Sequence, residues 1–177
     1  MSGRREESGT GRCRTRDATV RHHRVRPGVT VFADSSALVK LYADEPGHER
    51  IRQLSTLVVS QLARVEVPSA IWRKQRLGEL DAGAARLLTS AFEADWSGTE
   101  AEQSRFSAVT ATVAVLESAA RLCAVHGLRA YDAVQLACAS AARDAIPECQ
   151  TFAAFDRYLR GAAAAEGFSL VPAVPEA

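Results

Sequence analysis

Four acidic residues share one kind of position, the point where a short apolar run gives way to a helical pattern. Asp34 and Asp156 directly follow such runs, Asp132 opens a helical pattern, and Glu66 lies about a turn into another. Carboxylates brought together repel one another, so a fold gathers several of them chiefly where a cation supplies the opposite charge. Oxygen ligands without His or Cys indicate Mg²⁺ or Mn²⁺. Such an ion activates water against a phosphodiester, so the pattern predicts hydrolytic phosphate chemistry.

Each acid taken alone also has an explanation that involves no chemistry. Asp or Glu at a helix start is commonly a cap that satisfies backbone N–H groups and complements the helix dipole. The metal-site interpretation therefore depends on convergence of the four residues in space. An open parallel sheet provides it, because the carboxyl ends of its strands border one crevice.

From residue 29 onward, short apolar runs alternate with amphipathic helical patterns, which predicts an α/β fold with a parallel sheet. The expected strands are Val29–Ala33, Leu57–Val59, Phe106–Val109 and Gln150–Ala154, with Ser169–Val171 as a candidate edge strand. The expected helices are Ser36–Ala43, Gln61–Leu77, Asp81–Ala94, Thr112–His126, Asp132–Arg143 and Arg157–Glu166.

The composition limits the class of protein. A chain of 177 residues is long enough for one domain with a hydrophobic core. Charged residues interrupt every apolar stretch before the roughly 20 residues of a membrane span, and the N-terminus has no hydrophobic signal core. The four cysteines include no C-x-x-C pair, which suits a reducing compartment. We therefore expect a cytoplasmic protein that does not enter the membrane.

The N-terminal segment differs from the rest of the chain. Residues 1–28 carry eight Arg against three acids and show no strand or helix period. We interpret them as a disordered basic tail or a mis-assigned start, with an RNA-binding arm at Arg21–Arg26 as the alternative, and residues 29–177 as the folded domain. The remaining 14 basic and 18 acidic side chains do not indicate nucleic-acid binding through the overall charge.

The sequences around the four acids resemble the PIN-domain family, in particular the VapC-type toxins of type II toxin–antitoxin pairs. The resemblance runs from about Val31 to Leu170, and its most specific parts are D-S-S-A-L and L-R-x-x-D-A-x-x-L-A. The four matching segments are V-F-A-D-S-S-A-L-V-K (31–40), L-A-R-V-E-V (62–67), L-R-A-Y-D-A-V-Q-L-A (128–137) and T-F-A-A-F-D (151–156).

The resemblance implies a PIN-like three-layer α/β/α fold around a parallel sheet of about four to five strands. It also implies an endoribonuclease whose Mg²⁺ or Mn²⁺ ligands and catalytic residues are Asp34, Glu66, Asp132 and Asp156, with Ser36 as a hydroxyl that orders the site. The implied partners are an RNA substrate, a cognate antitoxin that inhibits the enzyme, and a second copy of the chain in a homodimer.

Two basic residues near the acids, Arg64 and Arg129, are candidate contacts for RNA phosphates, although solvated helix faces would also carry them. Two other functions stay open at this point. An aspartyl-phosphate phosphatase would need a second Asp at the position of Ser36. A catalytically idle PIN-fold binding module is compatible with Ala154, which stands where many relatives have Ser or Thr.

Overall fold

Five parallel strands form one sheet in the computed structural model of the chain, which describes residues 29–98 and 103–173. The strands are β1 (Thr30–Ala33), β2 (Thr56–Ser60), β3 (Phe106–Val109), β4 (Thr151–Ala153) and β5 (Ser169–Val171). Their order across the sheet is β3-β2-β1-β4-β5. β1 is buried along its whole length, as expected for a central strand of a parallel sheet with both faces covered. The predicted parallel sheet is confirmed, and Ser169–Val171 is an edge strand.

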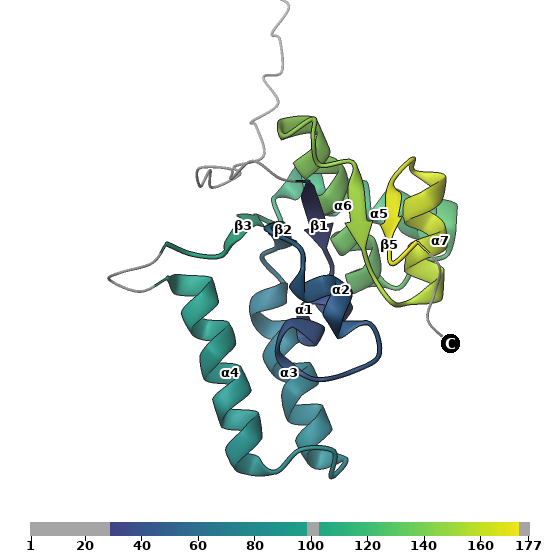
Figure 1. Cartoon of the computed structure of the whole chain (residues 1–177). Helices are drawn as coiled ribbons and strands as arrows, with labels where there is room; N and C mark the ends of the chain where they lie inside the picture. Colours follow the sequence, from purple (N-terminus) through teal and green to yellow (C-terminus); the bar gives the residue numbers. More distant parts are fainter. Residues whose placement is uncertain (1–28, 99–102, 174–177) are drawn as a thin grey trace, which may run out of the picture.

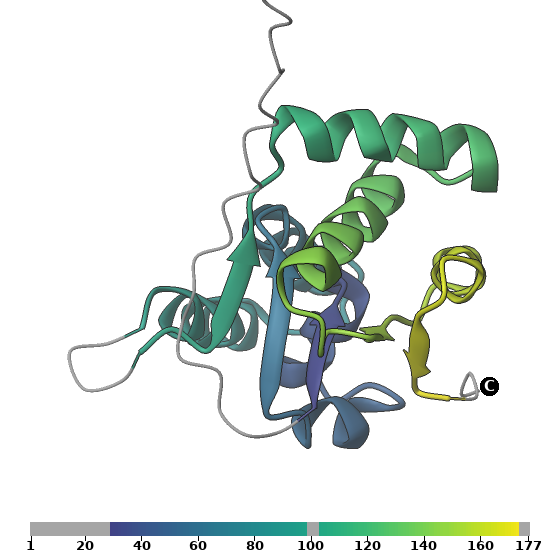
Figure 2. The same cartoon turned by 90° about the horizontal axis from the view of Figure 1, so that it is seen from above.

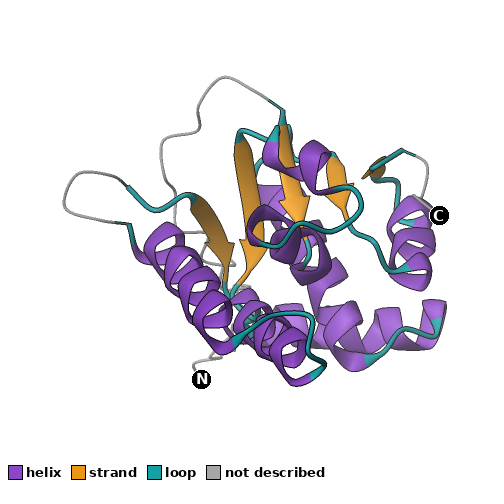
Figure 3. Ribbon diagram, turned by 60° about the horizontal axis from the view of Figure 1, so that its bottom comes forward, coloured by secondary structure: helices purple, strands orange, loops and turns teal. Residues whose placement is uncertain are grey.

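Helices cover both faces of this sheet (Figures 1 and 3). One face carries α1 (Ser35–Tyr42), α2 (His48–Arg52), α3 (Ala63–Arg76) and α4 (Ala82–Ser97). The other face carries α5 (Val113–His126), α6 (Ala130–Ala145) and α7 (Arg157–Ala165). The view from above in Figure 2 shows α5 and α6 on the side of the sheet opposite α1 and α2.

Alternation along the central strands divides the apolar side chains between two cores. Phe32 of β1 and Val58 of β2 pack under α5, α6 and α7. Val31 and Leu57, the preceding residues, pack under the other four helices. Successive side chains of a strand point to opposite faces, so buried strands in this sheet supply both cores. The predicted three-layer α/β/α fold is confirmed.

The structure corrects the sequence prediction at two helices. α2 was not predicted, because its five residues are too few to show a helical period. α6 begins at Ala130 and not at Asp132, so the predicted start was wrong. The N-cap of α6 is Arg129, whose side chain makes no capping hydrogen bond. Asp132 therefore lies in the first turn of the helix and does not cap it.

The strand order reverses beside β1. From β1 the chain continues to β2 and β3 on one side, while β4 and β5 lie on the other. The point between β1 and β4 is the place where open α/β sheets bind ligands, at the carboxyl ends of the strands. The backbone N–H of Asp34 donates to the carbonyl of Ala153 at 3.0 Å, which holds these two strand ends together.

The N-terminal segment and the membrane prediction remain to be placed against the fold. Residues 1–28, interpreted above as a basic tail, lie outside the described part of the chain. In the described part, none of the helices has the length and apolar character needed to cross a membrane.

Candidate active site

Asp34 is a buried carboxylate at the end of β1 and the N-cap of α1. Its Oδ1 accepts hydrogen bonds from the backbone N–H of Ala37 at 3.0 Å and from Ser36 Oγ at 2.8 Å. Only 6% of the residue is exposed. Burial, with a smaller contribution from the charge of Glu66, raises the pKa of Asp34 to about 6. An acid this costly to ionise in the fold is a stronger sign of a cation site than an exposed helix cap would be.

Ser36 joins the ends of β1 and β4. Its Oγ donates to Asp34 and accepts the backbone N–H of Phe155 at 3.0 Å. The buried Lys40 lies over the ring of Phe155, with Nζ 4.3 Å from the centroid, and donates to Glu45 Oε2 at 2.7 Å. These contacts fix the segment that leads from β4 to Asp156. The role of the Ser36 hydroxyl in ordering a functional site stays a prediction.

Glu66 reaches the same edge of the sheet from α3 and is held by two side chains from other elements. Its Oε2 accepts from Ser35 Oγ at 2.6 Å and from Gln135 Nε2 at 2.6 Å. Gln135 Nε2 also lies 3.0 Å from Ser35 Oγ, so the three groups form one polar cluster. Hydrogen bonds to an ionised carboxylate are stronger than those between neutral groups. Ser35 and Gln135 therefore orient Glu66.

Gln135 was not among the site residues predicted from the sequence. It is 2% exposed, and it follows Asp132 by three residues on α6, so the two side chains lie on neighbouring parts of one helix face. A polar amide within a run of buried α6 residues was the available signal, because buried amides are seldom tolerated without partners. Ser35 was likewise overlooked beside Ser36.

Asp132 lies within electrostatic reach of two other acids. Its pKa is raised, first by partial burial and then by the negative charges of Asp156 and Glu66. The positive charge of Arg129 acts in the opposite direction. Because Asp132 is not the cap of α6, the capping explanation of this residue is wrong. Because its charge acts on Asp132, Arg129 lies close enough to the acids to contact a phosphate bound beside them.

Asp156 is the most exposed of the four acids. It is the N-cap of α7, and its Oδ1 accepts the backbone N–H groups of Tyr158 and Leu159, both at 2.9 Å. Ala154, two residues earlier, is fully buried and supplies no side-chain hydrogen bond. The first turn of α7 thus orients Asp156. Ala154 has no hydroxyl group and contributes nothing to this orientation.

The structure brings all four predicted acids to one edge of the sheet. Asp34 is affected by the charge of Glu66, and Asp132 by the charges of Glu66 and Asp156. Across residues 29–98 and 103–173, however, no three His, Cys, Asp or Glu side chains are grouped closely enough to hold a metal ion as they stand. The acids are neighbours that are coupled by charge without forming a closed coordination cage.

The donor set suits a hard divalent cation. All four side chains supply carboxylate oxygens, the ligands that Mg²⁺ and Mn²⁺ prefer. Gln135 Oε1, in the polar cluster that holds Glu66, is buried and has no hydrogen-bond partner among the described residues. A buried acceptor of this kind is commonly satisfied by ordered water, and Mg²⁺ usually keeps several of its waters. The chemistry of these donors therefore fits a hydrated divalent ion, although the described side chains as they stand form no closed coordination cage.

Arg64, the other predicted phosphate contact, is directed toward a different element. Its Nη2 donates to Glu93 Oε2 on α4 at 2.9 Å, and its guanidinium carbon lies 5.8 Å from the centroid of the Trp96 ring. Glu66, two residues further along α3, contacts α1 and α6 instead. Arg64 thus lies near Glu66 on α3 but faces α4.

Comparison with known proteins identifies the family of the chain. The PIN domain family model matches residues 31–165, most of the chain. The chain belongs to the PIN-domain family and has a nuclease-type fold. PIN domains are generally nucleases and typically use divalent metals. No curated protein matches the chain.

Proposed function

We propose that the chain is an Mg²⁺- or Mn²⁺-dependent endoribonuclease and the toxin of a toxin–antitoxin pair. The observation that carries the enzymatic part is the gathering of Asp34, Glu66, Asp132 and Asp156 at the carboxyl edge of a PIN-type sheet, with Asp34 buried. Four helix caps would not need to converge, whereas ligands of one cation site must.

In this proposal the four acids hold the metal. When bound, the ion activates a water molecule and stabilises the negative charge that develops on the phosphodiester. Ser35 and Gln135 hold Glu66 in place through its Oε2, and Ser36 does the same for Asp34 through its Oδ1.

The protein also controls the charge around the substrate. Asp34, with a pKa of about 6, is ionised in neutral solution even without help from a cation. Asp132, whose pKa is raised, accepts a proton more readily than an ordinary aspartate. Arg129 lies near Asp132 and supplies positive charge for an RNA phosphate.

The toxin role rests on the D-S-S-A-L and L-R-x-x-D-A-x-x-L-A segments, which resemble VapC-type toxins. A cognate antitoxin would restrain the enzyme, and a cationic segment such as an Arg side chain laid among the acids complements their charge. We further propose that the chain acts as a homodimer, as such toxins commonly do.

RNA cleavage by matched α6 variants tests the enzymatic proposal. Asp132→Asn removes a proposed ligand, whereas Asp144→Asn makes the same change at an exposed position of the same helix. Purified protein is incubated with total cellular RNA in Mg²⁺, in Mn²⁺ and in EDTA. We expect metal-dependent cleavage that Asp132→Asn reduces by orders of magnitude and Asp144→Asn leaves intact. Absence of cleavage by the unaltered protein in both metals would support the binding-module alternative.

A further inference from the structure

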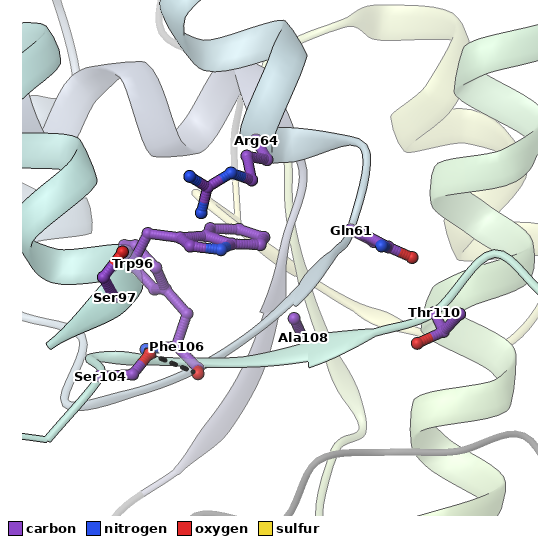
Figure 4. A pocket seen from close by; sticks show the side chains of 8 residues that line it. All are labelled: Gln61, Arg64, Trp96, Ser97, Ser104, Phe106, Ala108 and Thr110. Atoms are coloured by element: carbon purple, nitrogen blue, oxygen red, sulfur yellow. Dashed lines mark hydrogen bonds between the residues drawn. The ribbon is translucent and has the colours of Figure 1, made fainter.

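A groove runs along β3, an edge strand of the sheet, on the face covered by α3 and α4 (Figure 4). It encloses about 370 Å³, within the range of roughly 300 to 1,000 Å³ typical of sites for small organic ligands. We call it the β3 groove, and its principal lining residues are Gln61, Arg64, Trp96, Phe106, Ala108 and Thr110.

The β3 groove extends to the carboxyl end of β3, at the same edge of the sheet as the acids. Phe106, Ala108 and Thr110 alternate along β3 and just beyond its end, so the groove follows the strand to its carboxyl end. There the backbone N–H of Gln61 donates to the carbonyl of Val109 at 2.9 Å. Arg64 lies two residues before Glu66 on α3. A chain bound at the acids could thus place an adjoining unit in the groove.

The lining of the groove combines flat apolar surfaces with polar groups. The Trp96 ring packs against Phe92 and Phe106, with centroids 5.7 and 6.2 Å apart, which fixes its plane. The Arg64 guanidinium lies over this ring and is held by Glu93. Figure 4 shows Arg64 stacked over Trp96 at one end of the groove and the side chains of Gln61 and Thr110 at the other.

A small side chain leaves the space between these groups open. Ala108 is partly exposed at the middle of β3 and projects only a methyl group into the groove. A ligand that matches this site is planar, has apolar faces and carries hydrogen-bonding edges. Unpaired nucleobases have this form, and proteins bind them by stacking on aromatic rings and guanidinium planes.

We propose that the β3 groove holds one unpaired base of a single-stranded RNA, next to the phosphodiester at the acidic site. This inference rests on the proposed nuclease function and deepens it. A base within a duplex is stacked and paired and cannot enter the groove. The groove therefore assigns the enzyme a base subsite beside the acids.

Tryptophan fluorescence gives a direct test, because the chain has only two Trp residues. Trp72→Phe leaves Trp96 as the sole reporter, and Asp132→Asn in the same protein prevents cleavage of the probe. The probes are short oligomers of adenosine, uridine or cytidine, together with an abasic sugar-phosphate oligomer of equal length, all in Mg²⁺. We expect at least one base-bearing oligomer to quench Trp96 and the abasic oligomer to leave it unchanged.

Two further substitutions locate the base. Ala108→Leu fills the groove, and Arg64→Gln removes the guanidinium plane. Both substitutions should weaken binding of the base-bearing oligomer about five- to hundredfold, the range for loss of one stacked base. They should also reduce the ratio of the affinity for the base-bearing oligomer to the affinity for the abasic oligomer. Arg86→Gln makes the same charge change on the exposed surface of α4 and should have no effect. Circular dichroism establishes that each variant is folded, and if Ala108→Leu does not fold, the Arg64 and Arg86 pair decides.

Equal quenching by the abasic oligomer, or equal affinity of the groove variants and the Arg86 control, would overturn the base subsite. The base subsite is also overturned if no RNA oligomer changes the fluorescence of Trp96, which is the result expected if a protein segment occupies the groove. Failure of the proposed function is seen separately, as absence of RNA cleavage by the unaltered protein. Cleavage without any response of Trp96 would leave the nuclease standing and remove only the subsite.

Discussion

Replacing Asp34 by Asn should stabilise the metal-free protein. The folded-state pKa of Asp34 is about 6, whereas the ordinary value is 3.8, so the fold binds this proton more tightly than the unfolded chain does. Stability contributed by the protonated acid is present below about pH 4 and is lost as the pH rises to about 6. The difference of about two pKa units corresponds to about 3 kcal/mol, since each unit is worth 1.36 kcal/mol. Asn resembles the protonated acid at every pH and avoids this loss.

The pH dependence of the difference is the diagnostic result. In EDTA, Asp34→Asn should unfold at nearly the same temperature as the unaltered protein near pH 4. Near pH 8 it should unfold about 6 to 12 °C higher, because about 3 kcal/mol in a protein of this size shifts the melting temperature by that amount. Asn is also a good N-cap and can still accept from Ala37, so loss of the cap does not offset this gain. Thermal melting followed by circular dichroism between these pH values measures the effect.

Asp81→Asn is the matched control. Asp81 is the N-cap of α4, its Oδ1 accepts from Ala84 at 2.8 Å, and it is exposed and remote from the acids. This variant should melt like the unaltered protein at every pH. Added Mg²⁺ should raise the melting temperature of the unaltered protein and of Asp81→Asn more than that of Asp34→Asn, because only binding to the native state opposes unfolding. If Asp34→Asn and Asp81→Asn behave alike in EDTA and in Mg²⁺, Asp34 is an ordinary cap and the cation-site argument fails.

Three further predictions concern other parts of the site. Gln135→Met should lower RNA cleavage by about tenfold or more and lower the melting temperature by about 3 to 12 °C. Glu66 loses one of its two hydrogen bonds, each worth about 1.5–3 kcal/mol to a charged group. Gln150→Met is the exposed control, and equal cleavage rates of the two variants would exclude the positioning role. Arg160→Met should lower the free energy of unfolding in urea by about 3 kcal/mol, since the buried guanidinium donates to the carbonyls of Ala154, Val171 and Pro172. Arg157→Met changes an exposed side chain and should lower it little, so similar urea midpoints of the two variants would contradict this account. Cleavage should stop in EDTA and return with Mg²⁺ or Mn²⁺ but not with Zn²⁺, and recovery in Zn²⁺ alone would argue against an all-oxygen site.

The sequence by itself determined the features that depend on neighbouring residues. Apolar runs alternating with helical patterns predicted all five strands, because a buried parallel strand must be apolar on both faces. Asp34 and Asp156 were placed correctly at helix starts, because each lies between a strand and the helix that it caps, and both positions are local. The segments around the acids were enough to indicate the PIN-domain family, to which the chain belongs.

Only the tertiary structure decided how these residues are held. Gln135 contacts Ser35 and Glu66 across 100 and 69 residues of chain, and no local pattern encodes such a contact. Arg64 and Glu66 stand on one turn of α3, yet one faces α4 and the other faces α1 and α6. The raised pKa of Asp34 likewise comes from burial by elements distant in sequence. Local sequence selects the elements and their ends, but desolvation and side-chain contacts arise only when the elements pack.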